Sequence, residues 1–119
     1  MLLLDQFPRN AFRDTPRMYA TDELARKAAA VAIERGHDRA VDEQLQCFFY
    51  LPFGHSEDLA DRDRGVALVS RFSPEQQKYA LAHREVVRRF GRFPHRTAIL
   101  GRSSSEAELA FIADGGFAG

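Results

Sequence analysis

The sequence is poor in several residue types that mark particular classes of protein. Its 119 residues include one cysteine, no tryptophan, and only two lysines beside fifteen arginines. A single cysteine excludes an internal disulfide, and the neighbours of Cys47 (Leu45, Phe48 and Phe49) predict that it is a buried small apolar residue. Acidic and basic residues number 17 each, so no overall positive field exists to attract nucleic acid.

Long apolar runs are also missing. The opening leucine run is interrupted at Asp5, too early for a signal peptide, and no segment approaches the roughly 20 apolar residues of a membrane span. We therefore expect a cytoplasmic protein that has no membrane partner. Residues 1–119 fit a single domain with one modest core, since 45% of them are hydrophobic and 29% are charged.

Apolar side chains recur at the three- and four-residue steps of an α-helix in five segments. The predicted helices cover residues 22–35, 42 to about 51, 57 to about 72, 74–90 and 105–113. In the first, we expect Leu24, Ala28, Val31 and Ala32 to form the inward stripe. No segment has the β-branched alternation of a strand, so the sequence predicts an all-α fold of antiparallel helical hairpins.

Residues at the segment ends support these boundaries. Thr21, Ser56 and Ser73 are expected N-caps. Gly36 is placed to end the first helix, because glycine readily adopts the left-handed conformation that closes helices. Pro52 cannot donate a backbone hydrogen bond and should end or kink the second helix. Only Ser73 separates the third and fourth predicted helices, which indicates a tight hairpin.

Several longer strings go beyond composition. They are LLDQFPRN (3–10), YLPF (50–53), HSEDL (55–59), RFGRFPHR (89–96) and ILGR (99–102). Together they resemble the bacterial domain-of-unknown-function family 924, and the resemblance covers nearly the whole chain. It implies an all-α fold similar to tetratricopeptide-type helical pairs, arranged as a right-handed superhelix or bundle. The family has no established activity to carry over.

The resemblance also differs from the family pattern at one end. Members of that family extend upstream by several dozen residues with tryptophan-rich helices, whereas this chain opens inside the pattern at Met1. Helical pairs of this type bury their apolar faces against neighbouring pairs. We therefore expect an exposed apolar face near the start of this chain, covered by a second copy in a homodimer.

Two similar segments suggest an anion-binding corner. Phe7-Pro8-Arg9 and Phe93-Pro94-His95-Arg96 both place basic residues after Phe-Pro. Proline fixes the backbone while phenylalanine anchors in the core, so the arginine is held in a defined direction. Arg13 follows in a segment expected to be an irregular loop, because Pro8 and Pro16 interrupt any long helix there. The alternative is that both segments are structural turns.

His55, Glu57 and Asp58 form a second candidate group, at the start of the third predicted helix. Imidazole and carboxylate groups at such a junction could bind a metal or transfer a proton. No second histidine follows at zinc-type spacing, and no metal is assigned. The alternative is that Glu57 and Asp58 face the helix dipole and that His55 is a turn residue.

A third feature is the basic stretch from Lys78 to Arg102, which carries seven basic residues and one acid, Glu85. It includes Arg84, Arg88, Arg89, Arg92, His95 and Arg96. Interspersed phenylalanines are typical of a single-stranded nucleic-acid surface. The alternative is pairing within the molecule, for which Asp5, Glu57, Asp58, Asp61 and Asp63 are the candidate acids.

The leading hypothesis is a helical binding module, without a cofactor, that receives a carboxylate, a phosphate or an acidic peptide. The candidate binding residues are Arg9, Arg13, His55, Glu57, Asp58, Arg92, His95 and Arg96. The alternatives are a metal-dependent hydrolase that uses His55, Glu57 and Asp58, and a weak nucleic-acid binder. The sequence favours binding over catalysis without deciding between them. A shared site gains weight if Arg9, His55, Asp58 and His95 meet in one pocket.

Overall fold

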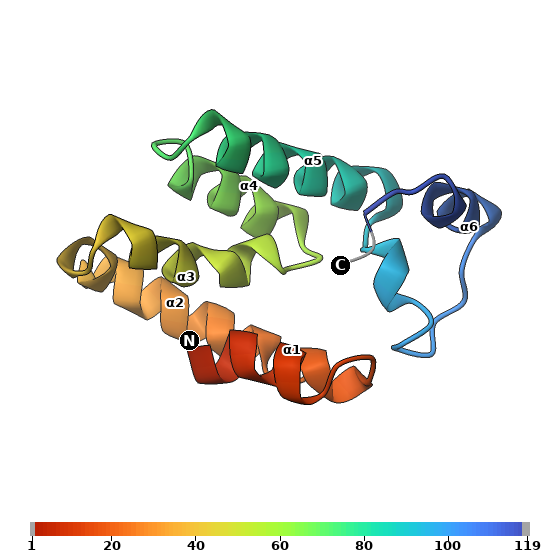
Figure 1. The fold of residues 1–119 in the computed structure, drawn as a ribbon, viewed down its shortest axis with the longest axis horizontal. Helices are drawn as coiled ribbons and strands as arrows, with labels where there is room; N and C mark the ends of the chain where they lie inside the picture. The colour runs from red at the N-terminus through yellow and green to blue at the C-terminus, as the bar shows by residue number, and fades with distance from the viewer. Residues whose placement is uncertain (1, 118–119) are drawn as a thin grey trace.

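The computed structural model describes residues 2–117, and Figure 1 shows helices joined mostly by short turns, with a longer connection before α6. The α-helices are α1 (Phe7–Ala11), α2 (Asp22–Glu34), α3 (Glu43–Gly54), α4 (Leu59–Leu68), α5 (Pro74–Phe90) and α6 (Glu106–Ala113). Short 3₁₀ or π turns are η1 (Leu2–Gln6), η2 (Pro16–Tyr19), η3 (His37–Ala40) and η4 (Pro94–Arg96). Residues 2–117 contain no β-strand, so the protein is all-α, as predicted.

The five predicted helices correspond to α2 through α6, and several of their ends are where the sequence indicated. Gly36 follows α2 with φ of 75°, a left-handed conformation that favours glycine. The Ser73 side chain accepts a hydrogen bond from the Gln76 amide at the start of α5. Ser105 caps α6 in a full capping box with Glu108.

Three expected boundaries are wrong. Pro52 does not end the second helix, since α3 continues to Gly54 with Pro52 inside it and buried. Ser56 is not an N-cap, because Asp58 accepts the hydrogen bond from Asp61 and α4 begins one residue later. Helix α4 stops at Leu68, so residues 69–73, rather than Ser73 alone, connect it to α5.

The segment around Arg9 is more regular than expected. It forms α1, which is preceded by η1, with Pro8 in the first helical turn where its missing N–H costs nothing. Pro16 begins η2 in the same way. Between them Asp14 adopts φ of 62°, and this left-handed residue separates the two helical pieces.

The inward face of α2 also differs from the predicted stripe. Ala25 and Ala29 are fully buried, whereas Leu24 and Val31 are 54% and 46% exposed. Asp22 lies one turn before Ala25 on the buried face and forms an ion pair with Arg9 of α1. This buried ion pair turns the alanine face inward and leaves the larger apolar residues outside.

Helix α2 packs against α3, α3 against α4 and α4 against α5, while α6 packs against η4 at the far end of the molecule (Figure 1). A small core of Val86, Val87 and Phe93 joins these two parts. The radius of gyration is 14.5 Å, against about 13.5 Å for a compact chain of this length. Within residues 2–117, none of the helices combines the length and hydropathy of a membrane span. The loose packing leaves a central cavity between the first and last helices.

Candidate functional site

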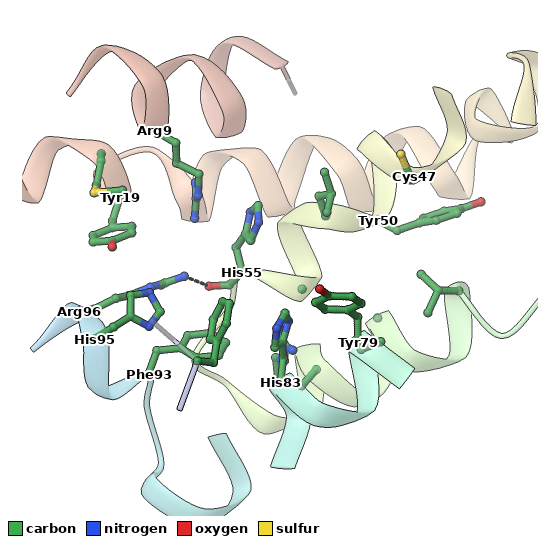
Figure 2. A pocket seen from close by; sticks show the side chains of 18 of the residues that line it. Arg9, Tyr19, Cys47, Tyr50, His55, Tyr79, His83, Phe93, His95 and Arg96 are labelled. Atoms are coloured by element: carbon green, nitrogen blue, oxygen red, sulfur yellow. Dashed lines mark hydrogen bonds between the residues drawn. The ribbon is translucent and has the colours of Figure 1, made fainter. Parts of the chain in front are cut away.

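A cavity of about 970 Å³ lies at the centre of the molecule, and its wall is formed by residues of η2, η4, α1 and the helices from α3 to α6. Its volume is near the upper end of the range for small-molecule sites. Figure 2 shows Arg9 entering from one side and Arg96 from the other, with His55 between them. The same view places Tyr79 and His83 of α5 beside each other on the opposite wall.

One wall of the cavity is a single face of α4. Arg62, Gly65, Val66 and Val69 line it, and the spacing of three and four residues puts them on one helical stripe. Arg62 is the first residue of this stripe, and the residues that follow it on the same face are apolar. Helix α3 passes close to the guanidinium of Arg62 at Gly54, which has no side chain. A Cβ placed on Gly54 would lie 3.7 Å from Nη1 of Arg62.

Arg62 is buried without a counterion. Its side chain is 2% exposed, and neither Nε nor Nη1 has a hydrogen-bond partner among residues 2–117. The guanidinium carbon lies 5.2 Å from the centroid of the Phe93 ring. Burial, reinforced by the charge of Arg96, lowers the pKa of Arg62 to about 10, so the group remains charged at neutral pH. A buried charge without a partner is costly.

Arg96 also lies beside the Phe93 ring. Its guanidinium carbon is 4.8 Å from the Phe93 ring centroid and 4.4 Å from the Tyr19 ring centroid. Nη2 donates a hydrogen bond of 2.7 Å to the backbone carbonyl of His55 (Figure 2). Nη1 lies 3.9 Å from a carboxylate oxygen of Asp22, while Nε is enclosed without a partner. Burial lowers the pKa of Arg96.

A buried network connects α1, α2 and the end of α3. Arg9 donates two hydrogen bonds to Asp22, at 2.7 and 2.9 Å, and its Nη1 lies 3.2 Å from Asp5. Asp5 also contacts Nδ1 of His55, at 2.7 Å, and accepts a hydrogen bond of 2.6 Å from the Gln6 side chain. Burial raises the pKa of Asp5, but the hydrogen bond and charge of His55 and the charge of Arg9 outweigh it, so the pKa lies below its usual value.

These groups leave an excess of positive charge. Three guanidinium groups (Arg9, Arg62 and Arg96) face two carboxylates (Asp5 and Asp22). The nearby Glu57 and Arg102 pair with each other at 2.9 Å, which adds one charge of each sign. Among these groups one positive charge is therefore uncompensated, and Arg62 and Arg96 both lie beside Phe93.

Two histidines in the cavity wall are neutral at pH 7. Burial, together with the charge of Arg62, lowers the pKa of His83 to about 4. Burial and the charge of Arg96 lower the pKa of His95 to about 4. Nδ1 of His95 is enclosed without a partner within residues 2–117. Neutral imidazoles offer hydrogen bonds to a ligand without adding charge.

The other end of the cavity is uncharged. Val69, Phe72 and Tyr79 line it, together with Tyr50 and the partly buried Cys47, which was expected in the core. The Tyr50 hydroxyl donates to Asp38 at 2.6 Å and accepts from Arg71 at 2.6 Å, both outside the cavity. Tyr50 therefore presents its ring to the cavity and not its hydroxyl.

The structure gathers five of the eight predicted binding residues in this one cavity. They are Arg9, Arg13, His55, His95 and Arg96. The other three are engaged elsewhere. Glu57 accepts hydrogen bonds from Arg102 and the Phe93 amide, Asp58 caps α4, and Arg92 forms an ion pair with Glu108.

The predicted His55, Glu57 and Asp58 group is not assembled. Each of the three has its own partner on a different element, although they are close in sequence. Among residues 2–117, no cluster of three histidine, cysteine or acidic side chains has a geometry that could hold a metal ion. The geometry required by the metal-dependent hydrolase hypothesis is therefore absent from this part of the chain.

The basic stretch is partly neutralised within the molecule. Arg84 pairs with Asp63, Arg88 with Glu85 and Arg92 with Glu108. Of the predicted acidic partners, Asp63 and Glu57 pair with this stretch. The others do not, since Asp5 pairs with Arg9, Asp61 pairs with Arg26, and Asp58 serves as a cap.

Sequence reasoning missed Arg62 and His83 as site residues. Each lies on the inward face of an amphipathic helix, at a position where the pattern calls for an apolar residue. Arg62 shares its stripe with Val66 and Val69, and His83 precedes the buried Val86 and Val87 by one turn. The signal that could have identified both residues is a polar side chain at a position within an apolar helical stripe.

Two comparisons with known proteins extend these observations. The solved structure of ATU0120, a protein of unknown function from Agrobacterium tumefaciens, superposes with a TM-score of 0.92 at 52% sequence identity. The match covers 95% of this chain and 64% of that one, so this chain spans less than two thirds of its length. A comparison with curated proteins gave no match. The model of DUF924, described as a bacterial protein of unknown function, matches residues 1–116, and the chain belongs to this family.

Proposed function

We propose that this chain is a binding module whose central cavity receives an anionic group of a small molecule, at Arg62 and Arg96. The observation that carries the proposal is Arg62, which is charged and buried but has no acidic partner within the described residues. A ligand carboxylate or phosphate would supply the missing counterion. Guanidinium groups suit this role, because their planar fork matches both anions.

The surroundings support an anion over a neutral ligand. Arg62 and Arg96 lie on the Phe93 ring within about 5 Å of its centroid, so their charges reinforce each other at one place. His83 and His95 stay neutral beside them and act as hydrogen-bonding groups. In the tetratricopeptide-like arrangement that we propose for α2 to α5, such a site would lie on the concave side, where these folds bind partners.

The test is calorimetric titration with inorganic phosphate and with acetate at pH 7.5 and low ionic strength. We expect saturable binding of at least one anion, weakened by added salt because the attraction is electrostatic. The variant Arg62→Met keeps an unbranched side chain of similar volume and removes the charge, so it should lose the binding. Equal anion binding by the wild type and by Arg62→Met would refute the proposed site.

The matched control is Arg88→Met. Arg88 also lies on a helix and also has one charge, but it is exposed and pairs with Glu85. Its removal should leave anion binding unchanged. If both variants lose binding equally, the anion interacts with the general positive charge of the chain and not with the cavity.

A further inference from the structure

The cavity has two chemically different ends, and α4 connects them. Its cationic end is built around Arg62, which α3 and α5 flank with Gly54 and His83. From Arg62 the stripe continues through Val66 to Val69, a distance of about 10 Å along the helix axis. We call this part of the cavity, lined by Arg62, Gly65, Val66 and Val69, the α4 groove.

Helices α3 and α5 also line the α4 groove, and their lining residues are uncharged along it. On α3 the lining runs from Gly54 back through Leu51 and Tyr50 to Cys47. The lining of α5 runs from His83 back through Ala80 and Tyr79 to Gln76. All three helices therefore turn uncharged side chains to the groove once they leave the guanidinium of Arg62.

The apolar end does not close abruptly. Cys47, Phe72 and Gln76 belong both to the main cavity and to an adjoining hollow of about 280 Å³. The Tyr50 and Phe72 rings, with centroids 5.7 Å apart, pack against each other in the wall of the main cavity. The adjoining hollow is also lined by the polar residues Glu43, Gln44 and Ser73, so the apolar surface available to a ligand is that of the main cavity, from Val66 to Phe72.

From this gradient we propose that the ligand of the α4 groove is an elongated amphipathic monoanion, with a carboxylate at Arg62 and Arg96 and an aliphatic tail along Val66 and Val69. This inference rests on the proposed function and adds the chemical class of the ligand. A compact anion would satisfy the charge but leave the apolar walls in contact with water. Burial of a tail against them contributes the additional affinity.

A series of straight-chain carboxylates tests the tail. Acetate, butanoate, hexanoate and octanoate carry the same charge and differ only in methylene groups, and 1-octanol has the tail without the charge. We expect affinity to rise with length by up to about fourfold for each methylene that the groove buries. Octanol should bind more weakly than octanoate, and Arg62→Met should abolish that difference.

A variant that fills the groove separates the tail from the charge. Val66→Phe adds bulk to the groove wall, so octanoate should lose its advantage while acetate binding is unchanged. Ala67→Phe is the control, because Ala67 is the next residue of α4 and is exposed outside the cavity. An NMR measurement on the wild type tests the tail without any variant. The methyl resonances of Val66 and Val69 should shift when octanoate is added but not when acetate is added.

The outcomes distinguish the two levels of the proposal. If all four carboxylates bind equally and all depend on Arg62, the anion site stands and the amphipathic ligand is wrong. If octanol binds as tightly as octanoate, or if Arg62→Met binds all of them like the wild type, the anion site itself is wrong. Length-dependent binding that requires Arg62, and that is blocked by Val66→Phe but not by Ala67→Phe, supports both.

Discussion

Nδ1 of His55 lies 2.7 Å from Oδ1 of Asp5, although the two residues are 50 positions apart in the chain. The contact joins the first turn of the protein to the end of α3. Asp5 also pairs with Arg9, and Arg9 with Asp22, so the same network reaches α2. The backbone of His55 accepts the hydrogen bond of Arg96, which extends the network to η4. One wall of the cavity therefore depends on Asp5.

We predict that Asp5→Asn destabilises the protein by about 3 kcal/mol, since the removal of one member of a buried charge network leaves its partner uncompensated. Arg9 keeps Asp22, which places the expected cost at the low end of the range for such changes. The measurement is urea denaturation followed by circular dichroism at pH 7.

Glu23→Gln is the control for this variant. Glu23 also pairs with a basic residue four positions away, Lys27, but both side chains are about 70% exposed. Its substitution should leave the denaturation midpoint unchanged. A midpoint for Asp5→Asn equal to that of the wild type would show that the buried contact contributes nothing.

Arg62→Met should stabilise the protein without ligand, by about 1 to 3 kcal/mol, because methionine fills a similar volume and removes an unpaired buried charge. The cation–π contact with Phe93 offsets part of this gain. Arg96→Met should have the opposite effect, since Arg96 donates to the carbonyl of His55 and lies near Asp22. Thermal and urea unfolding of the two variants provide the comparison. Destabilisation by both would mean that Arg62 is satisfied in the folded protein.

We expect stability to fall as the pH is lowered from about 6.5 to about 4.5. His83 and His95 have pKa values near 4 in the folded state, below the unfolded value of 6.5, so the unfolded chain takes up protons first. Each histidine should contribute a loss of about 1 kcal/mol per pH unit in this window. Burial is the main cause of both low pKa values. The charges of Arg62 and His55 lower the pKa of His83 further, and those of Arg96, His83 and Arg102 lower the pKa of His95, while Glu57 raises it.

The double variant His83→Gln and His95→Gln should therefore show a flatter profile between pH 6.5 and 4.5 than the wild type. Below that window the carboxylates protonate, and both proteins should lose stability. His37→Gln is the matched control, because His37 is exposed in η3 and should not change the slope. An equally steep profile in the double variant would show that other groups cause the acid sensitivity.

The helices were predictable because they depend on local signals. Ser73, Ser105 and Gly36 act through their own backbone and the next turn, and all three mark helix ends in the structure. The orientation of α2 was not predictable in this way. Leu24 and Val31 form a regular apolar stripe, yet the ion pair between Asp22 and Arg9 turns the other face inward.

The same distinction between local signals and contacts between distant segments applies to the residues of the candidate site. Arg9, His95 and Arg96 were identified because Phe-Pro fixes the local backbone before them. Glu57 was assigned both to the binding site and to the partners of the basic stretch, and only the pairing with Arg102, 45 positions away, decides between the two roles. Arg62 was missed because its helical stripe was read as core. Contacts between distant segments determine which charged residues are neutralised and which remain available to a ligand.

The exposed apolar residues of α2 lead to a prediction of self-association. Leu24 and Val31 are two turns apart on the outward face, with the exposed Ala28 between them. We propose that a second copy of the chain covers this stripe, which would form the predicted homodimer. The area is small, so the association should be weak and concentration-dependent. Sedimentation velocity between 5 and 500 μM, about two decades around the micromolar range, would detect it.

The double variant Leu24→Glu and Val31→Glu should remain monomeric over that range, because each substitution places a charge in the interface. Lys27→Glu is the control, since it changes the charge of the same exposed helix by a similar amount and removes no apolar surface. A wild-type protein that stays monomeric throughout would overturn the dimer. A double variant that still associates would place the contact on another face, away from Leu24 and Val31.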